Sequence, residues 1–340
     1  MTAAIGVPPQ FRHHLSIAII TGARTDRILE SSRVRSHAEA RRFEPRMRAS
    51  IVIRTLNEER YLPTVLDAIQ GQTVHPTDRE TIVVDSGSTD RTVEAAQEGG
   101  CVILHISREE FSFGRSLNRG CDAARGEVLV FLSGHCEPDD VQWLEKLISP
   151  IEDASAAISY GRQIGGPDTK FSEHQVFAKY FPPRDRFSDI PFFYNNANAA
   201  TTRTLWNQYL FDEDLTGLED LEFAKRTYLE QGARVEYVPD AVVYHHHHES
   251  WRQVKRRYER EALALQKIMP ELHFTTFDAI KCFLFGVGVD LQQTRLWYLT
   301  PGLLKQICAF RLCQFYGGWR GYHSHREITK KRKQKYFYPR

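Results

Sequence analysis

The sequence predicts an α/β fold whose mostly parallel β-sheet carries helices on both faces. From residue 49 onward, short runs of β-branched and aliphatic residues alternate with segments whose apolar residues recur at helical spacing. Strands separated by helices of this length form βαβ units, whose strands are parallel and whose helices pack on the sheet. The composition agrees, because 340 residues with 41% hydrophobic and 26% charged side chains are typical of a globular chain that buries its own core.

The predicted strands and helices follow one another in regular alternation. The first strand, 50–55, is the run Ser-Ile-Val-Ile-Arg-Thr, and the helix after it, 59–70, tolerates Pro63 in its first turn. Further strands are predicted at 81–84, 101–104, 128–132, 157–160 and 235–244. Further helices are predicted at 91–97, 115–124, 141–151, 219–231 and 251–267. Residues 165–200 are rich in Gly, Pro and aromatic residues, and we predict that they form loops over a site.

The charge distribution divides the chain into three segments. The formal net charge is +2, but residues 1–48 hold nine Arg against four acids, and residues 326–340 hold seven Lys and Arg against one acid. The remaining residues therefore carry a net charge of −9. We predict a disordered or spurious leader over 1–48, a globular domain over 49–270 and a helical segment with a basic tail over 271–340. The acidic central domain argues against nucleic acid as a partner.

Cysteine spacing and hydropathy predict a cytoplasmic location. The six cysteines are scattered without any C-x-x-C pair, which is typical of reduced thiols rather than a disulfide framework. No stretch of 18 apolar residues occurs, so no spanning helix is expected. The short apolar run at 15–20 is followed by several Arg residues and does not fit a secretory signal.

Polar residues follow two neighbouring strands of the predicted sheet. Thr55, Asn57 and Glu58 end the first strand, and Asp85 and Ser88 follow the second. The carboxyl ends of parallel strands meet at one edge of the sheet, where ligands of open α/β folds bind. Capping of the next helix is the alternative role for Ser88. Two such clusters at adjacent strand ends favour a nucleotide pocket.

Four motifs in a fixed order resemble a known enzyme family. They are Ser-Ile-Val-Ile-Arg-Thr-Leu-Asn-Glu from residue 50, Val-Val-Asp-Ser-Gly-Ser-Thr-Asp from 83, Gly-Arg-Ser-Leu-Asn from 114 and Gly-Leu-Glu-Asp-Leu-Glu from 217. As a set they resemble the family 2 glycosyltransferases of the GT-A type, over roughly residues 50–260. The globular domain over 49–270 is then expected to be a GT-A glycosyltransferase domain.

The resemblance implies a transfer with inversion, in which a sugar passes from a nucleotide-diphosphate donor to a hydroxyl of a saccharide or lipid-linked acceptor. It implies a role in making a cell-surface polysaccharide or glycolipid. Thr55, Asn57 and Glu58 would line the nucleoside pocket together with Asp85, Ser88, Arg115 and Asn118. Glu219 and Asp220 would supply the catalytic base, with Asp220 preferred. Acidic residues at a helix N-terminus are common, so a purely structural role for this pair is the alternative.

The motif that usually binds the metal is altered in this chain. Where the family has Asp-x-Asp after the fourth strand, this sequence has Ser133-Gly134-His135. A second source of imidazole follows the last strand, where His245 and His247 alternate and can point to the same side. Imidazole suits Mn²⁺ or a softer ion better than Mg²⁺. A divalent cofactor, Mn²⁺ or Mg²⁺, is therefore an open prediction, and an exposed histidine run without a partner is the alternative.

The C-terminal segment predicts contact with a membrane surface. Residues 276–322 interleave aromatic and aliphatic residues with Lys and Arg at helical spacing, which is typical of amphipathic helices on an anionic bilayer. The basic tail adds attraction of about 1 kcal/mol per Lys or Arg near that surface. A helical cap packed on the catalytic domain is the alternative. We expect peripheral association with the inner face of the membrane.

Two further functions remain as alternatives to glycosyl transfer. The loss of Asp-x-Asp is compatible with a catalytically silent protein that binds nucleotide sugars. A nucleotidyltransferase on the same fold requires a basic, Gly-rich loop after the first strand, and Thr55-Leu56-Asn57-Glu58 provides none. The Q-x-x-R-W signature of processive synthases is also missing, because the region reads Arg256-Arg257-Tyr258-Glu259-Arg260. This favours the addition of one sugar at a time.

Overall fold

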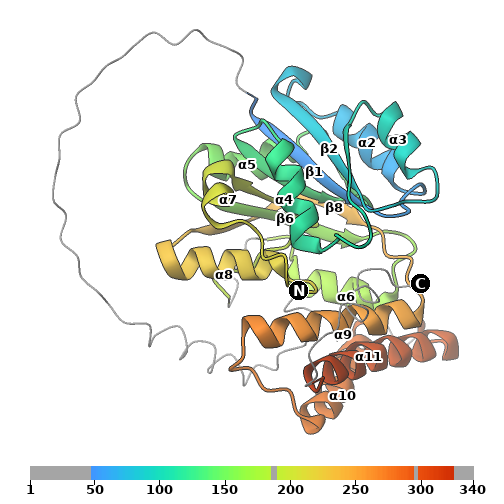
Figure 1. The fold of residues 1–340 in the computed structure, drawn as a ribbon. Helices are drawn as coiled ribbons and strands as arrows, with labels where there is room; N and C mark the ends of the chain where they lie inside the picture. Colours follow the sequence, from blue (N-terminus) through green and yellow to red (C-terminus); the bar gives the residue numbers. More distant parts are fainter. Residues whose placement is uncertain (1–46, 185–189, 295–297, 325–340) are drawn as a thin grey trace, which may run out of the picture.

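A mixed β-sheet with helices on both faces forms the body of the protein (Figure 1). The computed structural model describes residues 47–184, 190–294 and 298–324. The predicted leader lies outside the described residues except for Met47 and Arg48, and the basic tail over 326–340 lies outside them entirely.

The sheet joins a parallel half to a mixed half. Within the described residues its strand order is β3-β2-β1-β4-β7-β6-β8-β5. The neighbours β3, β2, β1 and β4 run parallel, as do β6 and β8, whereas β7 is antiparallel to β4 and β6, and β5 to β8. The predicted, mostly parallel sheet is confirmed. The strands are β1 Ala49–Thr55, β2 Arg79–Asp85, β3 Val102–His105, β4 Val128–Ser133, β5 Cys136–Pro138, β6 Ile158–Gly165, β7 Asn198–Thr202 and β8 Val235–His245.

The helices agree with the predicted alternation, except for α7, which was not predicted, a later start of α2 and a helix within 165–200. They are α2 Leu62–Gln70, α3 Thr92–Glu98, α4 Phe113–Ala123, α5 Trp143–Glu152, α6 Phe171–Tyr180, α7 Arg203–Tyr209, α8 Glu219–Gln231, α9 Trp251–Ile268, α10 Thr276–Gln293 and α11 Pro301–Tyr322. Helix α2 begins three residues later than predicted, because residues 59–61 form a turn in which the N–H groups of Tyr61 and Leu62 donate to the carbonyl of Glu58. The prediction of loops throughout 165–200 is wrong, because α6 and the start of β7 lie there. The buried face of α6 includes Ser172 and Glu173, so it lacks the apolar period of a typical helix.

Alternate residues of β1 show why helices cover both faces of the sheet. Val52 lies in one core cluster with Leu117 of α4, and Ile51 lies in the other with Leu62 of α2. Successive strand side chains point to opposite faces, so a run of aliphatic residues requires a hydrophobic layer on each side. Both layers are present, as the sequence predicted.

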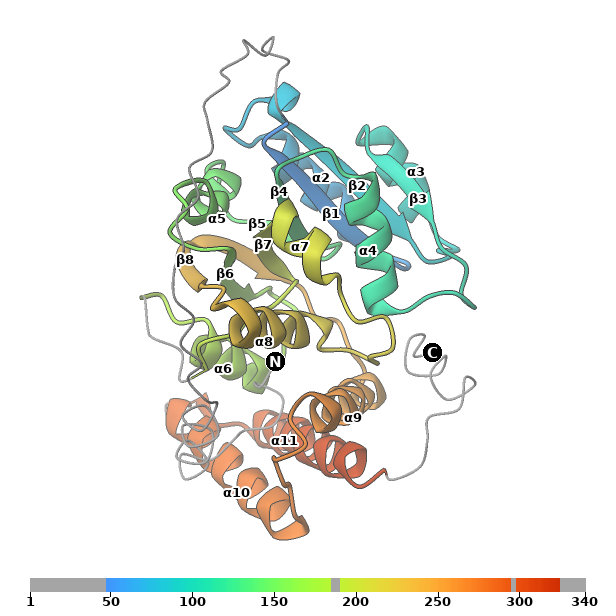
Figure 2. The ribbon, with the colours of Figure 1, turned by 60° about the vertical axis from the view of Figure 1, so that its left-hand side comes forward.

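The C-terminal helices form a layer beside the sheet, with α9 and α11 packed closely (Figure 2). Glycines allow this approach, since a Cβ on Gly317 would lie 2.5 Å from Lys255 O and one on Gly321 would lie 2.2 Å from Glu259 O. Reciprocal capping pairs, Ser250 with Gln253 and Thr275 with Asp278, begin α9 and α10. None of the described helices is both long and apolar enough to span a bilayer.

A buried ion pair joins α10 to α11 and leads to a stability prediction. Asp290 is completely buried, and its two oxygens accept from Arg311 Nε at 2.8 Å and Nη2 at 2.5 Å. Removing one partner leaves a charge buried without compensation, so we expect Arg311→Met to lower the free energy of unfolding by about 3–5 kcal/mol. The double variant Asp290→Leu/Arg311→Met is expected to recover most of that loss in urea denaturation. Equal stability of the wild type and the single variant would contradict this.

Candidate functional site

A pocket of about 530 Å³ opens at the carboxyl ends of β1 and β4. Its lining includes most of the residues that the sequence singled out. These are Thr55, Asn57, Glu58, His135, Glu219, Asp220, His245 and His247. The position agrees with the general rule for open α/β sheets, in which ligands bind beyond the carboxyl ends of the strands.

The loops after β1 and β2 are clamped together by side-chain-to-backbone hydrogen bonds. Ser88 Oγ accepts from the backbone N–H of Asn57 at 2.9 Å, and Asn57 Oδ1 accepts from the N–H of Thr89 at 2.8 Å. Asn57 has a φ of 57°, which asparagine tolerates better than most residues. The Asp85 carboxylate accepts from the N–H groups of Gly87 and Ser88. Asp85 and Ser88 therefore shape this rim, while Thr55 and Asn57 line the pocket itself.

Glu219 and Asp220 are the first two residues of α8, and both side chains are buried. The residue before them, Leu218, has a φ of 60°, a left-handed conformation that is strained for a branched side chain. Glu219 Oε1 accepts from Arg54 Nη1 at 2.9 Å. Asp220 instead accepts from two backbone N–H groups, that of Leu221 at 2.8 Å and that of Asn196 at 3.1 Å. The two carboxylates thus differ in their partners.

The environment of Asp220 makes it a proton acceptor near neutral pH. Burial, and then the adjoining Glu219 carboxylate, raise the pKa of Asp220 to about 6. A base with such a pKa is ionised at pH 7 and is still a better proton acceptor than an ordinary aspartate. Asp220 is therefore well suited to accept a proton from a hydroxyl.

This pKa predicts how activity depends on pH. A base must be deprotonated to act, so kcat/KM is expected to be constant well above pH 6 and to fall about tenfold per pH unit well below it. The measurement is the initial rate over pH 4.5–8.5, with circular dichroism to verify that the chain stays folded. A rate that stays constant down to about pH 4.5 would contradict a base with this pKa.

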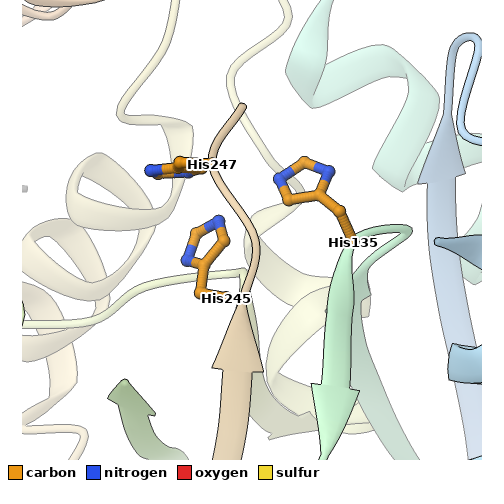
Figure 3. A group of neighbouring side chains, drawn as sticks. All are labelled: His135, His245 and His247. Atoms are coloured by element: carbon orange, nitrogen blue, oxygen red, sulfur yellow. The ribbon is translucent and has the colours of Figure 1, made fainter. Parts of the chain in front are cut away.

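Three histidine rings that line the pocket lie close to one another (Figure 3). His135 lies in the turn between β4 and β5, and His245 and His247 lie at the end of β8. Pairing of β5 with β8 brings the two segments together, and the N–H of His246 donates to the carbonyl of His135. One ring nitrogen from each of the three residues lies within 4.8 Å of the other two. His245 is buried and His247 is half-buried, unlike the exposed His248 beside them.

Each ring of this cluster is oriented by an oxygen acceptor. The Nδ1 atoms of His135, His245 and His247 lie 2.8, 2.8 and 2.7 Å from oxygens of Glu58, Gln163 and Glu173, respectively. An Nδ1–H that donates to such an oxygen leaves the Nε2 lone pair free, which is the usual arrangement around a metal-bound histidine. Burial and the neighbouring imidazoles lower the pKa of His245, which keeps that ring neutral. The three rings therefore fit a divalent cation that accepts nitrogen ligands.

Comparisons with known proteins agree with this geometry. Residues 50–211 match the sequence family described as glycosyl transferase family 2. This part of the chain is a family 2 glycosyltransferase domain. It is 29% identical over 226 residues to the O-antigen chain rhamnosyltransferase RfbN of Salmonella typhimurium, an alignment that covers 62% of this chain and 70% of RfbN.

Solved structures with the GT-A fold resemble this glycosyltransferase domain. S. aureus TarS 1–349, in complex with UDP-GlcNAc, matches with a TM-score of 0.52 and 16% identity, over 83% of this chain and 95% of TarS. The mannosyltransferase PcManGT of Pyrobaculum calidifontis, in complex with GDP-Man and Mn²⁺, matches with a TM-score of 0.55 and 16% identity, over 82% of this chain and 88% of PcManGT. At this identity the similarity shows the fold, and it confirms the predicted class.

Arg115 and Asn118 of the glycosyltransferase lie outside the residues that line the pocket. Arg115 Nε donates to Glu213 at 2.7 Å. The Asn118 amide is buried, donates to the carbonyl of Phe211 and accepts from the indole of Trp206. Both side chains thus hold the segment before α8 against α4. Their contact with a nucleotide stays a prediction.

Several charged residues near the site could not be identified from the sequence. Glu173 of α6 accepts from His247 and from Arg257 of α9, and Arg257 also pairs with Glu249 at 2.7 Å. Glu173, His247 and Glu249 could by themselves suggest a second metal site, but the Arg257 guanidinium pairs with both carboxylates. Only the three-dimensional packing of α6 on α9 and on the end of β8 assembles this network.

Proposed function

We propose that the protein transfers one sugar at a time from a nucleotide-diphosphate donor to a hydroxyl of a saccharide or lipid-linked acceptor, with inversion. The observation that carries the proposal is the buried Asp220 carboxylate in a pocket at the carboxyl ends of the strands. The similarity to a protein named as an O-antigen chain rhamnosyltransferase supports a surface polysaccharide or glycolipid as the product. The UDP-GlcNAc and GDP-Man bound by TarS and PcManGT support a nucleotide sugar as the donor.

In the proposed reaction, Asp220 accepts the proton of the acceptor hydroxyl. The hydroxyl oxygen attacks the anomeric carbon of the donor, the bond from that carbon to the diphosphate oxygen breaks, and the nucleoside diphosphate leaves with the electron pair. Attack opposite the leaving group inverts the anomeric configuration. Thr55, Asn57 and Glu58 line the part of the pocket that we assign to the nucleoside, with Asp85 and Ser88 holding its rim.

We assign a divalent metal to His135, His245 and His247. Three imidazole ligands favour Mn²⁺ or a softer ion over Mg²⁺, which prefers oxygen ligands. When bound, such an ion supplies positive charge for the departing diphosphate. Glu58, Gln163 and Glu173 keep the three rings in orientation for it.

We propose that α10 is the face by which the protein meets a membrane. In both ribbon views α10 lies at the end of the molecule away from the sheet (Figures 1 and 2). Four large apolar side chains on it are more than half exposed: Phe277 by 73%, Ile280 by 55%, Leu284 by 63% and Phe285 by 64%. An exposed apolar stripe on a helix fits contact with a bilayer surface. Helix α10 also packs on the protein, since it contacts α11.

The membrane proposal predicts the outcome of a flotation experiment. The full chain is expected to float with vesicles of phosphatidylcholine and phosphatidylglycerol at low salt, and less so at high salt. The variant Phe277→Ser/Leu284→Ser is expected to lose most of this binding, because about 1.5–3 kcal/mol of burial is lost per side chain. Leu229→Ser, an exposed residue on α8, serves as the matched control. Absence of wild-type flotation at low salt would contradict the proposal.

A donor screen tests the proposed reaction. UDP-, GDP- and dTDP-sugars are incubated with the full chain, Mn²⁺ and a lipid or saccharide acceptor, and nucleotide release and the anomeric configuration of the product are measured by NMR. We expect turnover with one nucleotide class and an inverted product. Binding of a nucleotide sugar without any release would favour the catalytically silent alternative. A nucleotidyltransferase would instead form nucleotide sugar from nucleoside triphosphate and sugar phosphate.

A further inference from the structure

Arg54 connects three elements around the paired carboxylates. It lies next to the end of β1, donates from Nη1 to Glu219 Oε1 at 2.9 Å and to the carbonyl of Phe113 at 3.2 Å. Its guanidinium also lies over the Phe113 ring, 5.0 Å from the centroid. The Glu219 side chain is only 5% exposed and that of Arg54 is 22% exposed, so water screens this ion pair weakly. The first residues of α4 and α8 are thus tied to the sheet by one cation.

Asp220 has a different set of neighbours. None of the ion pairs among the described residues includes it, and its oxygens accept from backbone N–H groups instead. The titratable groups that face it are Glu219 on its own helix and Tyr194. Arg54 from β1 and Arg260 from α9 lie on the Glu219 side of the pair.

We propose that Arg54 is a positioning residue that holds the Glu219 carboxylate as its ion-pair partner, so that the neighbouring Asp220 is left as the proton acceptor. This inference rests on the proposed role of Asp220 as the base and adds the residue that divides the roles of the pair. Two adjoining buried carboxylates without a cation share a proton, because both cannot easily be ionised at once. Arg54 pairs with the Glu219 carboxylate at 2.9 Å, whereas Asp220 accepts, among the described residues, only from backbone N–H groups, so the two carboxylates are not equivalent.

The consequence for each substitution has a definite sign. Without the Arg54 cation, the pair takes up its first proton at higher pH, so Arg54→Gln raises the pH at which Asp220 is protonated. Glu219→Gln removes the neighbouring negative charge and leaves the cation, so it lowers that pH. Arg54→Lys retains the charge and is expected to stay close to the wild type. If Arg54 and Glu219 had only a structural role, their substitutions would not shift the titration of Asp220 in opposite directions.

Carbon-13 NMR of the full chain, labelled at the aspartate carboxyl carbons, tests this without any substrate. The Asp220 signal is assigned by its loss in Asp220→Asn and followed over pH 4.5–8.5. We expect a wild-type midpoint near 6, a rise of about one pH unit in Arg54→Gln and a fall in Glu219→Gln. Arg125→Gln, which removes an arginine paired with Glu80 at the other end of the strands, is the charge-matched control and is expected to leave the midpoint unchanged.

Two results would overturn the inference. One is an Asp220 midpoint in Arg54→Gln that coincides with those of the wild type and Arg125→Gln. The other, which decides the case if Arg54→Gln does not fold, is an unchanged midpoint in Glu219→Gln. A chain that shows the expected shifts but transfers no sugar would count against the proposed function and leave the role of Arg54 intact.

Discussion

Replacing Asp220 by asparagine is expected to lower the turnover number roughly 100- to 10,000-fold, the usual contribution of a general base. Asparagine has nearly the same shape and still accepts one of the two backbone hydrogen bonds that hold Asp220, but it cannot take a proton. Because Asp220 is not expected to touch the nucleotide, the affinity for the donor should change less than threefold or so. Single-turnover kinetics and calorimetry measure the two quantities separately.

Asp122→Asn is the matched control, because Asp122 is exposed on α4 and is not among the pocket residues. It should retain wild-type turnover. Full activity of Asp220→Asn would exclude Asp220 as the base. Loss of donor binding together with turnover would instead point to a structural role at the N-terminus of α8.

Removal of two imidazoles from the three-histidine cluster is expected to abolish metal-dependent activity. We predict that His245→Ala/His247→Ala loses tight Mn²⁺ binding and at least about 100-fold in turnover, because the departing diphosphate then lacks its counter-charge. Treatment of the wild type with EDTA should have a similar effect that added Mn²⁺ reverses. Calorimetric titration with Mn²⁺ and initial rates give the two readouts.

His248→Ala is the control for metal binding, since His248 belongs to the same histidine run but is exposed and outside the cluster. It should bind Mn²⁺ as the wild type does. If the two variants bound Mn²⁺ equally well, the cluster would not be the metal site and the histidine run would be a surface feature.

The strand–helix alternation and the polar strand ends are the parts of the structure that the sequence reveals well. The β-branched run of β1 and the aliphatic run of β4 place apolar side chains on both faces of the sheet. Helices on both sides of the sheet are needed to cover them. The clamp between Asn57 and Ser88 follows from the parallel register that pairs Thr55 with Asp85. These features depend on local pattern, which a single sequence carries.

Features that depend on long-range packing are not visible in the sequence. The amphipathic period of α6 is obscured because Glu173 is buried there to hold His247 and Arg257. In the sequence, Arg54 is a single polar residue within a strand. Its hydrogen bond to Glu219 joins residues that are 165 positions apart. Asn118 matched a motif, yet its amide is used in packing against Phe211 and Trp206. In each case the fold, not the neighbouring residues, decides the role.

Calorimetry of UDP-, GDP- and dTDP-sugars with the full chain, in the presence and absence of Mn²⁺, tests most directly whether the three histidines replace the usual acidic metal motif of a nucleotide-sugar site. We predict that one nucleotide class binds and that Mn²⁺ tightens its binding by about tenfold or more, equivalent to about 1.4 kcal/mol. The gain should disappear in His245→Ala/His247→Ala. Nucleotide binding that is the same with and without Mn²⁺ would contradict the proposed metal site.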